Sequence, residues 1–482
     1  MLAPRSDFLW HRTLLEGKLQ LVRSQLNDLC QSCPPLATPA DLIAYEQDIQ
    51  ELTQRLHALL TAYAIQTAAL SPSLRHATRR FLAPAAYPMK NQGWRPVSLQ
   101  FAQGPTMVVF LPYYSLAKAR SGRRSKGCFP ALLLLGICDR CSPSLAGDVA
   151  EMTALLSSFQ EARNLLRQRG IFLSVNKLRK VAYHFARRVR SAQPTATMFA
   201  GQSVKGRTVV ITTDGGRMRI RKDRKAKTKK GRKRYSTRWR EPKLLMIYTI
   251  QQKNGRAQID KTFAPVIDGT LNGPDVLFGL MRYYLEQLNI TEADKVLVVA
   301  DGAKWIWKRV GSLLRGLKIA TEKIHQAVDF YHAMEHLSKA ADLTKRFTET
   351  QKKKWLKTQS KRLLSGETEK VVAELEAMAA RQPKNKKLKT ERGYFVRHGR
   401  EKKRMEYATL AKLGMPQGSG AIESAVRRVI NLRLKGAGIF WHKQSGEAML
   451  LLRSFAKAGR FQDLHALAFA SPIRPAPETD KA

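Results

Sequence analysis

Two segments of the chain share an apolar run that ends in Asp-Gly, and this repeated unit constrains the fold more than any other feature. The first is TVVITTDGG, residues 208–216, in which a β-branched run predicts a buried strand that ends at Asp214. The second is KVLVVADGAKW, residues 295–305, whose strand ends at Asp301. A single Asp-Gly pair is an ordinary turn signal. Two such strands in one sheet, however, bring two carboxylates together, which is costly unless a cation lies between them.

The ligand types at this predicted site narrow the choice of metal. Carboxylates are hard oxygen donors, and few His or Cys residues lie near either Asp in the sequence. Such donors suit Mg²⁺ better than zinc. The sequence therefore predicts a magnesium site where the two strands end.

The chain carries a large excess of positive charge, with 85 Lys and Arg against 38 Asp and Glu and a net charge of +47 over 482 residues. Such a field binds polyanions tightly, so we expect double-stranded DNA as the partner, with an acidic membrane surface as the competing one. The longest apolar run, 129–138, is too short to span a bilayer, and no signal peptide is recognised. These features predict a cytoplasmic, nucleoid-associated protein of two to four domains with no membrane association.

The five cysteines include two CxxC pairs, Cys30 with Cys33 and Cys138 with Cys141, and Cys128 stands apart. Two CxxC pairs can share a zinc ion, but these pairs lie more than a hundred residues apart. We therefore expect reduced, structural thiols.

Residues 1–80 predict a helical region with the seam of a coiled coil or a helical hairpin. The seam positions are Tyr45, Ile49, Leu52, Leu56, Leu59 and Tyr63. Two interpretations stay open: dimerisation, giving a homodimer or higher oligomer on DNA, and packing against an earlier helix at 15–29. Prolines then mark the start of the region 81–205.

The region 81–205 contains a helix ended by Gly170, a short turn, and a basic helix that begins after the N-cap candidate Ser174. Helix, turn and basic helix follow the order of a helix-turn-helix, whose second helix enters the major groove. An ordinary helical pair with a solvated basic face is the alternative. The residues expected to contact DNA are Lys177, Arg179, Lys180, Arg187 and Arg188.

Residues 222–240 follow a predicted strand, GRMRIR, and more than half of them are Lys or Arg, with Tyr235 and Trp239 between them. This composition cannot form a core, so we predict a mobile loop along a nucleic-acid backbone, with a solvated hairpin tip as the alternative. The residues expected to contact DNA are Lys225, Lys229, Lys230, Arg232 and Lys233.

The remaining elements predict an α/β fold with a mixed sheet. Three early strands (208–214, GRMRIR and KLLMIYTIQ), a helix, the Asp301 strand, a helix and a further strand follow the order of a ribonuclease H-like core. We expect this core to span 206–340 and 417–465, with a helical insertion at 341–416 and a flexible tail at 466–482. The returning segment carries Glu423 early in a helix. Four basic residues after it are expected to contact DNA: Arg427, Arg428, Arg433 and Lys435.

Asp214, Asp301 and Glu423 form a triad of acids in the order strand, strand, helix. On the segments ITTDGG, VVADGAKW, VDFYHAMEHL and GSGAIESAVRRVINLRLKGAGIFW, the chain resembles DDE-class transposases of bacterial insertion sequences, in the Mutator-like group. The resemblance implies that the triad binds two Mg²⁺ ions, with Mn²⁺ as a substitute. It also implies strand cleavage at transposon ends, strand transfer into target DNA, and a role near the metals for His332 in a DxxH element that begins at Asp329.

Two other functions remain open. One is a catalytically silent DNA-binding protein derived from a transposase. The other is a zinc metalloprotease, because His332, Glu335 and His336 match H-x-x-E-H. The protease interpretation leaves both the net charge and the two Asp-Gly units without a role.

Overall fold

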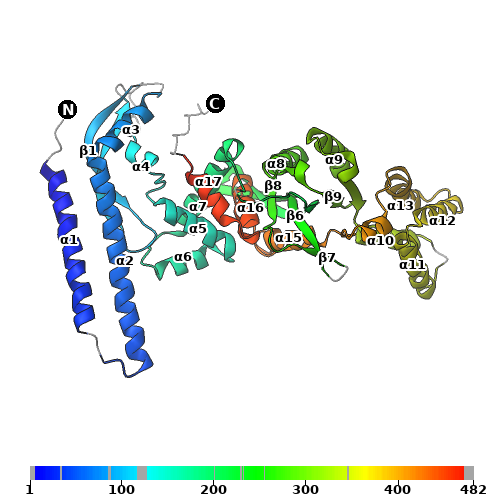
Figure 1. Cartoon of the computed structure of the whole chain (residues 1–482), viewed down its shortest axis with the longest axis horizontal. Helices are drawn as coiled ribbons and strands as arrows, with labels where there is room; N and C mark the ends of the chain where they lie inside the picture. Colours follow the sequence, from blue (N-terminus) through cyan, green and yellow to red (C-terminus); the bar gives the residue numbers. More distant parts are fainter. Residues whose placement is uncertain are drawn as a thin grey trace. The chain divides into compact units, whose positions relative to one another are not determined.

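The computed structural model describes residues 6–32, 35–84, 88–116, 127–199, 201–227, 231, 233–253, 256–344 and 347–471 (Figure 1). The chain divides into two compact units, each of which is described by itself. The first unit comprises 1–193 with 464–482, and the second comprises 194–463. No helix in the described ranges is both long and apolar enough to cross a membrane.

The first unit is mainly helical and contains one two-stranded sheet. Its elements are α1 (Ser6–Gln31), α2 (Pro39–Leu70), α3 (Pro72–Leu82), β1 (Met89–Leu99), β2 (Met107–Leu116), α4 (Pro130–Leu134), α5 (Pro143–Leu155), α6 (Phe159–Arg167), α7 (Val175–Ala192) and the end of α17 (Phe461–Phe469). Strands β1 and β2 pair in antiparallel fashion. Helix α17 extends into the predicted flexible tail, and residues 472–482 lie outside the described part of the chain.

Helices α1 and α2 pack against each other along the predicted seam. Leu59 is buried there, and the Tyr63 hydroxyl donates to Glu16 Oε1 over 2.8 Å. The N-terminus of α2 is fixed by a capping box between Thr38 and Asp41. The seam of α2 thus packs against α1 of the same chain, which agrees with the predicted packing against an earlier helix. Dimerisation stays a prediction.

Helix α7 is amphipathic, as the sequence predicts. Leu178, Val181 and Phe185 are buried on one face, while the Lys and Arg residues lie toward the other. The Ser174 hydroxyl accepts from the Lys177 N–H at 3.2 Å, so the predicted N-cap is confirmed. The apolar face packs on α5 and α6.

The second unit has a central mixed sheet with helices around it. Its strands are β3 (Thr208–Gly215), β4 (Met218–Lys227), β5 (Lys233–Arg240), β6 (Lys243–Lys253), β7 (Arg256–Ile259), β8 (Val266–Thr270), β9 (Lys295–Ala300) and β10 (Ile324–Val328). Its helices are α8 (Pro274–Gln287), α9 (Lys304–Gly316), α10 (Phe330–Asp342), α11 (Glu349–Leu364), α12 (Thr368–Ala380), α13 (Lys386–Phe395), α14 (Tyr407–Lys412), α15 (Gly420–Val426) and α16 (Lys443–Lys457). The predicted α/β architecture with a mixed sheet is confirmed.

The sheet has the strand order β10-β9-β3-β6-β7, and β8 also pairs with β6. Strand β3 is central: it runs parallel to β9 and antiparallel to β6, and β10 continues the parallel side. Most residues of β3, β8 and β9 are buried, which explains their continuous apolar and β-branched sequences. Helix α8 packs on β6 and β8, and α15 packs on β3 and β6.

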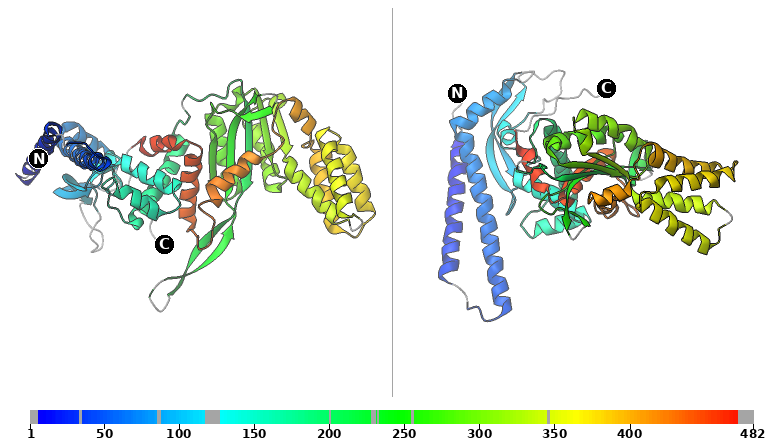
Figure 2. Two further views of the ribbon diagram at one scale, coloured as in Figure 1. Left: turned by 90° about the horizontal axis from the view of Figure 1, so that it is seen from below. Right: turned by 45° about the vertical axis from the view of Figure 1, so that its right-hand side comes forward.

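The basic segment after β3 differs from its prediction in two ways. Strands β4 and β5 form an antiparallel ribbon with pairs from Met218–Arg240 to Lys227–Lys233, instead of a mobile loop (Figure 2). Strand β4 is also absent from the central sheet in the described chain, where β6 takes the place predicted for it. Met218 and Ile220 at the start of β4 are buried. Cation–π contacts add to the stability of the ribbon, because Arg221 stacks on Tyr235 and Arg219 on Trp239.

Helices α11 to α14 occupy the segment predicted as an insertion, and they form a group beside α10 (Figures 1 and 2). The Tyr407 hydroxyl ties this group to the sheet by donating to the Val328 carbonyl at 3.0 Å. The described cysteines, Cys30, Cys128, Cys138 and Cys141, are free thiols. Cys33 lies outside the described residues, so a zinc ion shared between the two CxxC pairs stays untested.

Candidate active site

Asp214 and Asp301 lie at the same end of two neighbouring strands: Asp214 is still paired with β6, and Asp301 directly follows β9. Strands β3 and β9 pair in parallel up to Thr213 opposite Ala300, and each Asp is the next residue. The register is fixed by the buried residues that precede both acids. The two carboxylates predicted to lie together therefore come from adjacent positions on adjacent strands. Both are half-buried.

The surroundings of Asp214 disfavour its charged form. Burial raises the pKa of Asp214, and the negative charges of Asp301 and Glu423 raise it further, against the opposing effects of the Gly215 N–H and His332. The charges of both other predicted acids thus act on Asp214, although the three acids are not one of the groups with metal-binding spacing in the described chain. A cation placed among them would remove the repulsion that raises this pKa.

Asp329 is completely buried behind this group and anchors two helices. Its Oδ1 accepts from the His332 N–H at 2.9 Å, which caps α10. Its Oδ2 accepts from the Ser419 hydroxyl at 2.5 Å and also from the Ser419 N–H. Burial acts to raise the pKa of Asp329, but the hydrogen bonds from His332 and Ser419 outweigh it and hold this pKa well below the usual range.

Glu423 reaches the site because Ser419 directly precedes α15. Serine before a helix commonly caps it, but the Ser419 hydroxyl makes no cap hydrogen bond and donates to Asp329 instead. Asp329 therefore fixes the start of the helix that carries Glu423. Donor atoms of Asp329, His332 and Glu423 all lie within 4.8 Å of one another. Sequence reasoning missed the role of Ser419, although the QGSG turn that contains it is visible.

His332 is the basic member of this group. Its Nδ1 lies 3.4 Å from Asp329 Oδ1, and the side chain is 33% exposed. The interaction with Asp329, opposed by burial and reinforced by the charges of Asp301 and Glu335, raises the pKa of His332 to about 9. His332 is consequently cationic at neutral pH, next to the three acids.

This raised pKa predicts a pH-dependent contribution to stability. Because the folded-state pKa of about 9 exceeds the ordinary value of 6.5, the contribution is complete below pH 6.5 and is lost as the pH rises through 9. In urea titrations with a chelator present, the stability difference between wild type and His332→Gln should shrink across this interval. A difference that stays constant from pH 6 to pH 10 would contradict a cationic His332 in the fold.

The structure does not support the zinc-protease motif. His336 Nδ1 pairs with Glu391 Oε2 at 2.5 Å, and its ring stacks on Tyr394 at 3.8 Å. Among the described residues, neither group with metal-binding spacing contains His336 together with His332. The two histidines of H-x-x-E-H therefore contact different residues and do not form one metal-binding group.

The donors at the strand ends fit a hard divalent cation. Asp214, Asp301 and Glu423 offer carboxylate oxygens, and the chemistry of this set suits Mg²⁺. Both oxygens of Asp329 are already taken by Ser419 and His332, so Asp329 supports the site from behind.

The predicted DNA-contacting residues fall in three places. In α7, Arg179 and Arg187 are exposed, Lys180 pairs with Asp139, and Arg188 donates to the carbonyls of Gly136 and Ser471. In the ribbon, Lys225, Lys227 and Lys233 lie on strands, while Lys229, Lys230 and Arg232 lie outside the described residues.

The residues after Glu423 include one correction. Arg428 and Lys435 are at least partly exposed, but Arg433 is only 7% exposed and its guanidinium lies over the Trp441 ring. Arg433 is therefore part of the packing and is not available to a phosphate. A π-helical turn, Arg427–Asn431, directly follows α15.

Comparison with protein families and with curated proteins gives no match. Among solved structures, the chain is similar to the Drosophila P element transposase strand transfer complex, at 11% sequence identity and a TM-score of 0.23. The similarity covers 69% of this chain and 82% of that chain. A TM-score of this size does not establish a shared fold.

Proposed function

We propose that the protein is a DDE-class DNA transposase that binds transposon ends and catalyses metal-dependent strand cleavage and strand transfer. The observation that carries the proposal is that Asp214 and Asp301 occupy neighbouring positions on paired strands, with the charge of Glu423 also acting on Asp214, in a chain with a net charge of +47. Carboxylates that lie close together repel one another, and a bound cation would remove this repulsion, so we take the three acids as a candidate functional site. The test is whether DNA cleavage needs both a divalent cation and these three acids.

The strand order supports assigning the sheet to the ribonuclease H-like class. A central strand, β3, pairs antiparallel with β6, which pairs antiparallel with β8, while β9 and β10 add in parallel on the other side. The first Asp lies on the central strand, but β6 and β8 form the antiparallel side, where the sequence predicted the GRMRIR strand and KLLMIYTIQ. Membership of the Mutator-like group rests on the sequence resemblance alone.

Asp214, Asp301 and Glu423 are the residues that would hold two Mg²⁺ ions, with Mn²⁺ as a substitute. When bound, such ions activate a water or a 3′-hydroxyl and stabilise the leaving oxygen of an in-line displacement. The paired strands β3 and β9 position Asp214 and Asp301, and the hydrogen bond between Ser419 and Asp329 positions the helix that carries Glu423. His332, cationic and partly exposed, is placed to donate to a phosphate oxygen.

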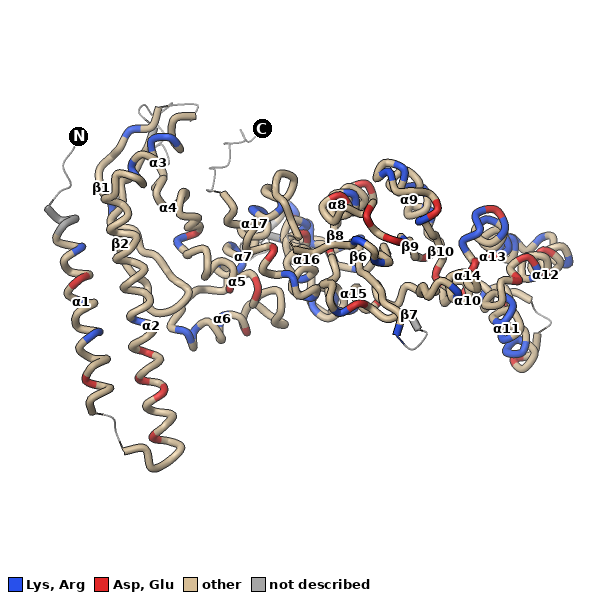
Figure 3. Tube along the Cα trace, viewed as in Figure 1, with Lys and Arg blue, Asp and Glu red and all other residues tan. Residues whose placement is uncertain are grey.

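Basic surfaces provide a route for DNA toward the acids. Lys and Arg are spread over both units, and α11 is especially rich in them (Figure 3). The β4–β5 ribbon begins shortly after Asp214, and Ile220 bridges to Trp441 in the segment that follows α15. We assign phosphate contacts to the ribbon and recognition of transposon ends to α7, and we expect a homodimer or higher oligomer on DNA.

The ribbon assignment predicts a weaker affinity that does not depend on DNA sequence. Four exposed ribbon residues are to be replaced by Gln: Lys222, Arg224, Arg234 and Arg238. Binding to end DNA and to random DNA should weaken alike, because phosphate contacts carry little sequence information. The salt slope, measured by fluorescence anisotropy, should fall by about 0.9 for each phosphate that the protein no longer neutralises.

A matched control separates a local effect of the ribbon from the effect of net charge. The control variant replaces four exposed lysines of α11 by Gln: Lys353, Lys354, Lys357 and Lys361. It lowers the net charge by the same amount at another place. If both variants show equal slopes, the ribbon contributes only general charge and the assignment of phosphate contacts to it is wrong.

A further inference from the structure

A second cluster of metal-ligating side chains lies in the first unit, away from the acids described above. It is built on a tight turn, residues 138–141, between α4 and α5. The Cys138 N–H donates to the Cys141 carbonyl at 3.2 Å, and the Cys141 N–H donates to the Cys138 carbonyl at 2.9 Å. Asp139 and Arg140 have φ values of 53° and 61°, in the left-handed region. Two consecutive non-glycine residues in this region persist only where the surroundings hold them.

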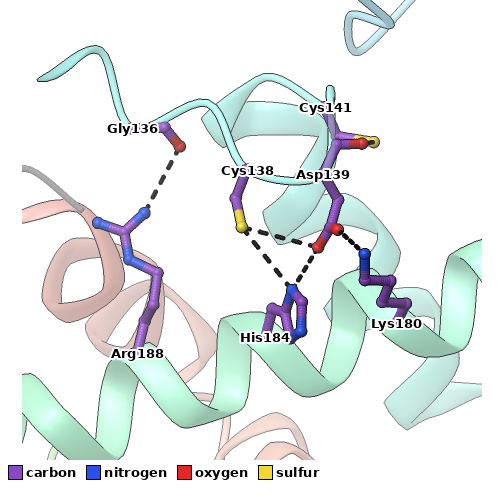
Figure 4. Close-up of polar contacts among 7 residues, drawn as sticks. All are labelled: Gly136, Cys138, Asp139, Cys141, Lys180, His184 and Arg188. Carbon is purple, nitrogen blue, oxygen red and sulfur yellow. Dashed lines mark hydrogen bonds and ion pairs between the residues drawn. The ribbon is translucent and has the colours of Figure 1, made fainter. Parts of the chain in front are cut away.

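The turn and α7 together bring three different donor atoms to one point, two from the turn and one from the helix (Figure 4). Cys138 Sγ lies 3.6 Å from Asp139 Oδ2 and 3.9 Å from His184 Nδ1. Asp139 Oδ2 and His184 Nδ1 are also in contact, and all three donors lie within 4.8 Å of one another. Zinc with a sulfur bond of about 2.3 Å and a nitrogen or oxygen bond of about 2.0 Å separates tetrahedral ligands by about 3.5 Å.

The second oxygen of the carboxylate has its own partner. Lys180 Nζ lies 2.7 Å from Asp139 Oδ1, so Asp139 Oδ2 is held toward the thiol and the imidazole. Outer contacts of this kind orient metal ligands. The Cys141 sulfur points away from the cluster and contacts the Asp139 carbonyl at 3.6 Å (Figure 4).

We propose that Cys138 Sγ, Asp139 Oδ2 and His184 Nδ1 bind one Zn²⁺ ion, with water as the fourth ligand. A set of one sulfur, one nitrogen and one oxygen donor suits zinc rather than Mg²⁺. The two sulfur separations match tetrahedral ligands, while Asp139 Oδ2 and His184 Nδ1, which are in direct contact, move apart when both bind the ion. The ion fastens the 138–141 turn to the middle of α7, the helix to which we assign recognition of transposon ends. Binding releases the Cys138 thiol proton to solvent, since the thiolate is the ligand.

Cobalt titration of the full-length protein tests this site separately from the acidic one. The protein is stripped with a chelator and titrated with Co²⁺, which gives a thiolate-to-cobalt charge-transfer absorption only where sulfur is a ligand. We expect this absorption to saturate at one equivalent and to disappear when Zn²⁺ is added. Asp301→Ala should leave the absorption unchanged, so the result does not depend on the transposase assignment.

Matched variants identify the ligands. Cys138→Ser should abolish the absorption, and His184→Ala should weaken Co²⁺ binding at least tenfold, with folding checked by circular dichroism. Cys141→Ser and Cys30→Ser should retain it. Wild-type protein without the absorption at stoichiometric Co²⁺ would overturn the proposal. So would an absorption that survives Cys138→Ser or disappears equally in Cys141→Ser. If Cys138→Ser does not fold, the Co²⁺ affinity of His184→Ala is the test. An affinity equal to that of the wild type would then overturn the proposal.

Discussion

Asp301→Ala should lower the rate of DNA strand cleavage by on the order of 10³-fold or more, because metal-bound charge stabilisation supplies several kcal/mol in such reactions. DNA affinity should stay within about threefold of wild type, since removing one carboxylate from a chain of net charge +47 does not weaken phosphate contacts. Cleavage is measured on end-labelled DNA at saturating protein, and affinity by mobility shift on the same fragment. Asp214 and Glu423 should behave in the same way.

Two further variants separate metal binding from folding. Asp301 Oδ1 accepts from the Ala303 N–H at 3.0 Å at the start of α9, and Asp301→Asn keeps an oxygen for this hydrogen bond. Glu335→Ala removes an acid from α10 that is not one of the three proposed metal ligands. We expect Asp301→Asn to be as inactive as Asp301→Ala, and Glu335→Ala to be active. An Asp301→Asn protein that retains more than about a tenth of wild-type cleavage would show that the carboxylate is not a ligand.

Asp329→Ala should destabilise the protein by about 3–5 kcal/mol and also abolish cleavage, because it removes a buried carboxylate that accepts three hydrogen bonds and pairs with the partly exposed His332. The Ser419 N–H and hydroxyl lose their acceptor, and α15 loses the anchor that positions Glu423. Ser419→Ala should cost only about 1–2 kcal/mol, since one neutral donor is removed. Urea denaturation of the full-length chain measures both.

The pH dependence of this effect has a defined sign. The pKa of Asp329 is depressed below its ordinary value of 3.8, so its contribution to stability is present above that value and is lost as the pH falls through the folded pKa. The difference between wild type and Asp329→Ala should therefore shrink in acid, as Asp329 is protonated, and also above pH 6.5, as its partner His332 loses its proton. Equal urea midpoints for the two proteins at pH 7 would contradict the anchor.

The strands that deliver the acids were predictable because burial dictates their composition. Val209 to Ile211 and Val296 to Val299 are buried, and a continuous β-branched run followed by Asp-Gly has few other uses. The ribbon was predicted as a mobile loop, with a hairpin tip as the alternative, because Lys and Arg suggest disorder. Backbone pairing, cation–π contacts and the buried Met218 and Ile220 hold β4 and β5 instead. Strands β7 and β8 were missed, since four and five residues carry too little periodicity.

Long-range partners were beyond sequence reasoning. Asp329 and Ser419 are 90 residues apart, with the α11–α14 insertion between them, and a Ser before a helix predicts only a cap. Arg433 looked like one more cation in a basic helix, yet its side chain is buried over Trp441. The sequence alone does not show whether an Arg side chain is exposed to solvent or packed over an aromatic ring.

The most direct test of the proposed function is cleavage of the DNA that flanks this gene. Purified protein is incubated with labelled fragments that carry the gene's two borders, with Mg²⁺ or with a chelator, beside the Asp301→Asn variant. We predict Mg²⁺-dependent breaks at the borders that leave 3′-hydroxyl ends, followed by their joining to a target plasmid. Chelator and Asp301→Asn should each eliminate both products. Border cleavage of equal rate in Asp301→Asn, or in the absence of any divalent cation, would contradict a catalytic site made of Asp214, Asp301 and Glu423.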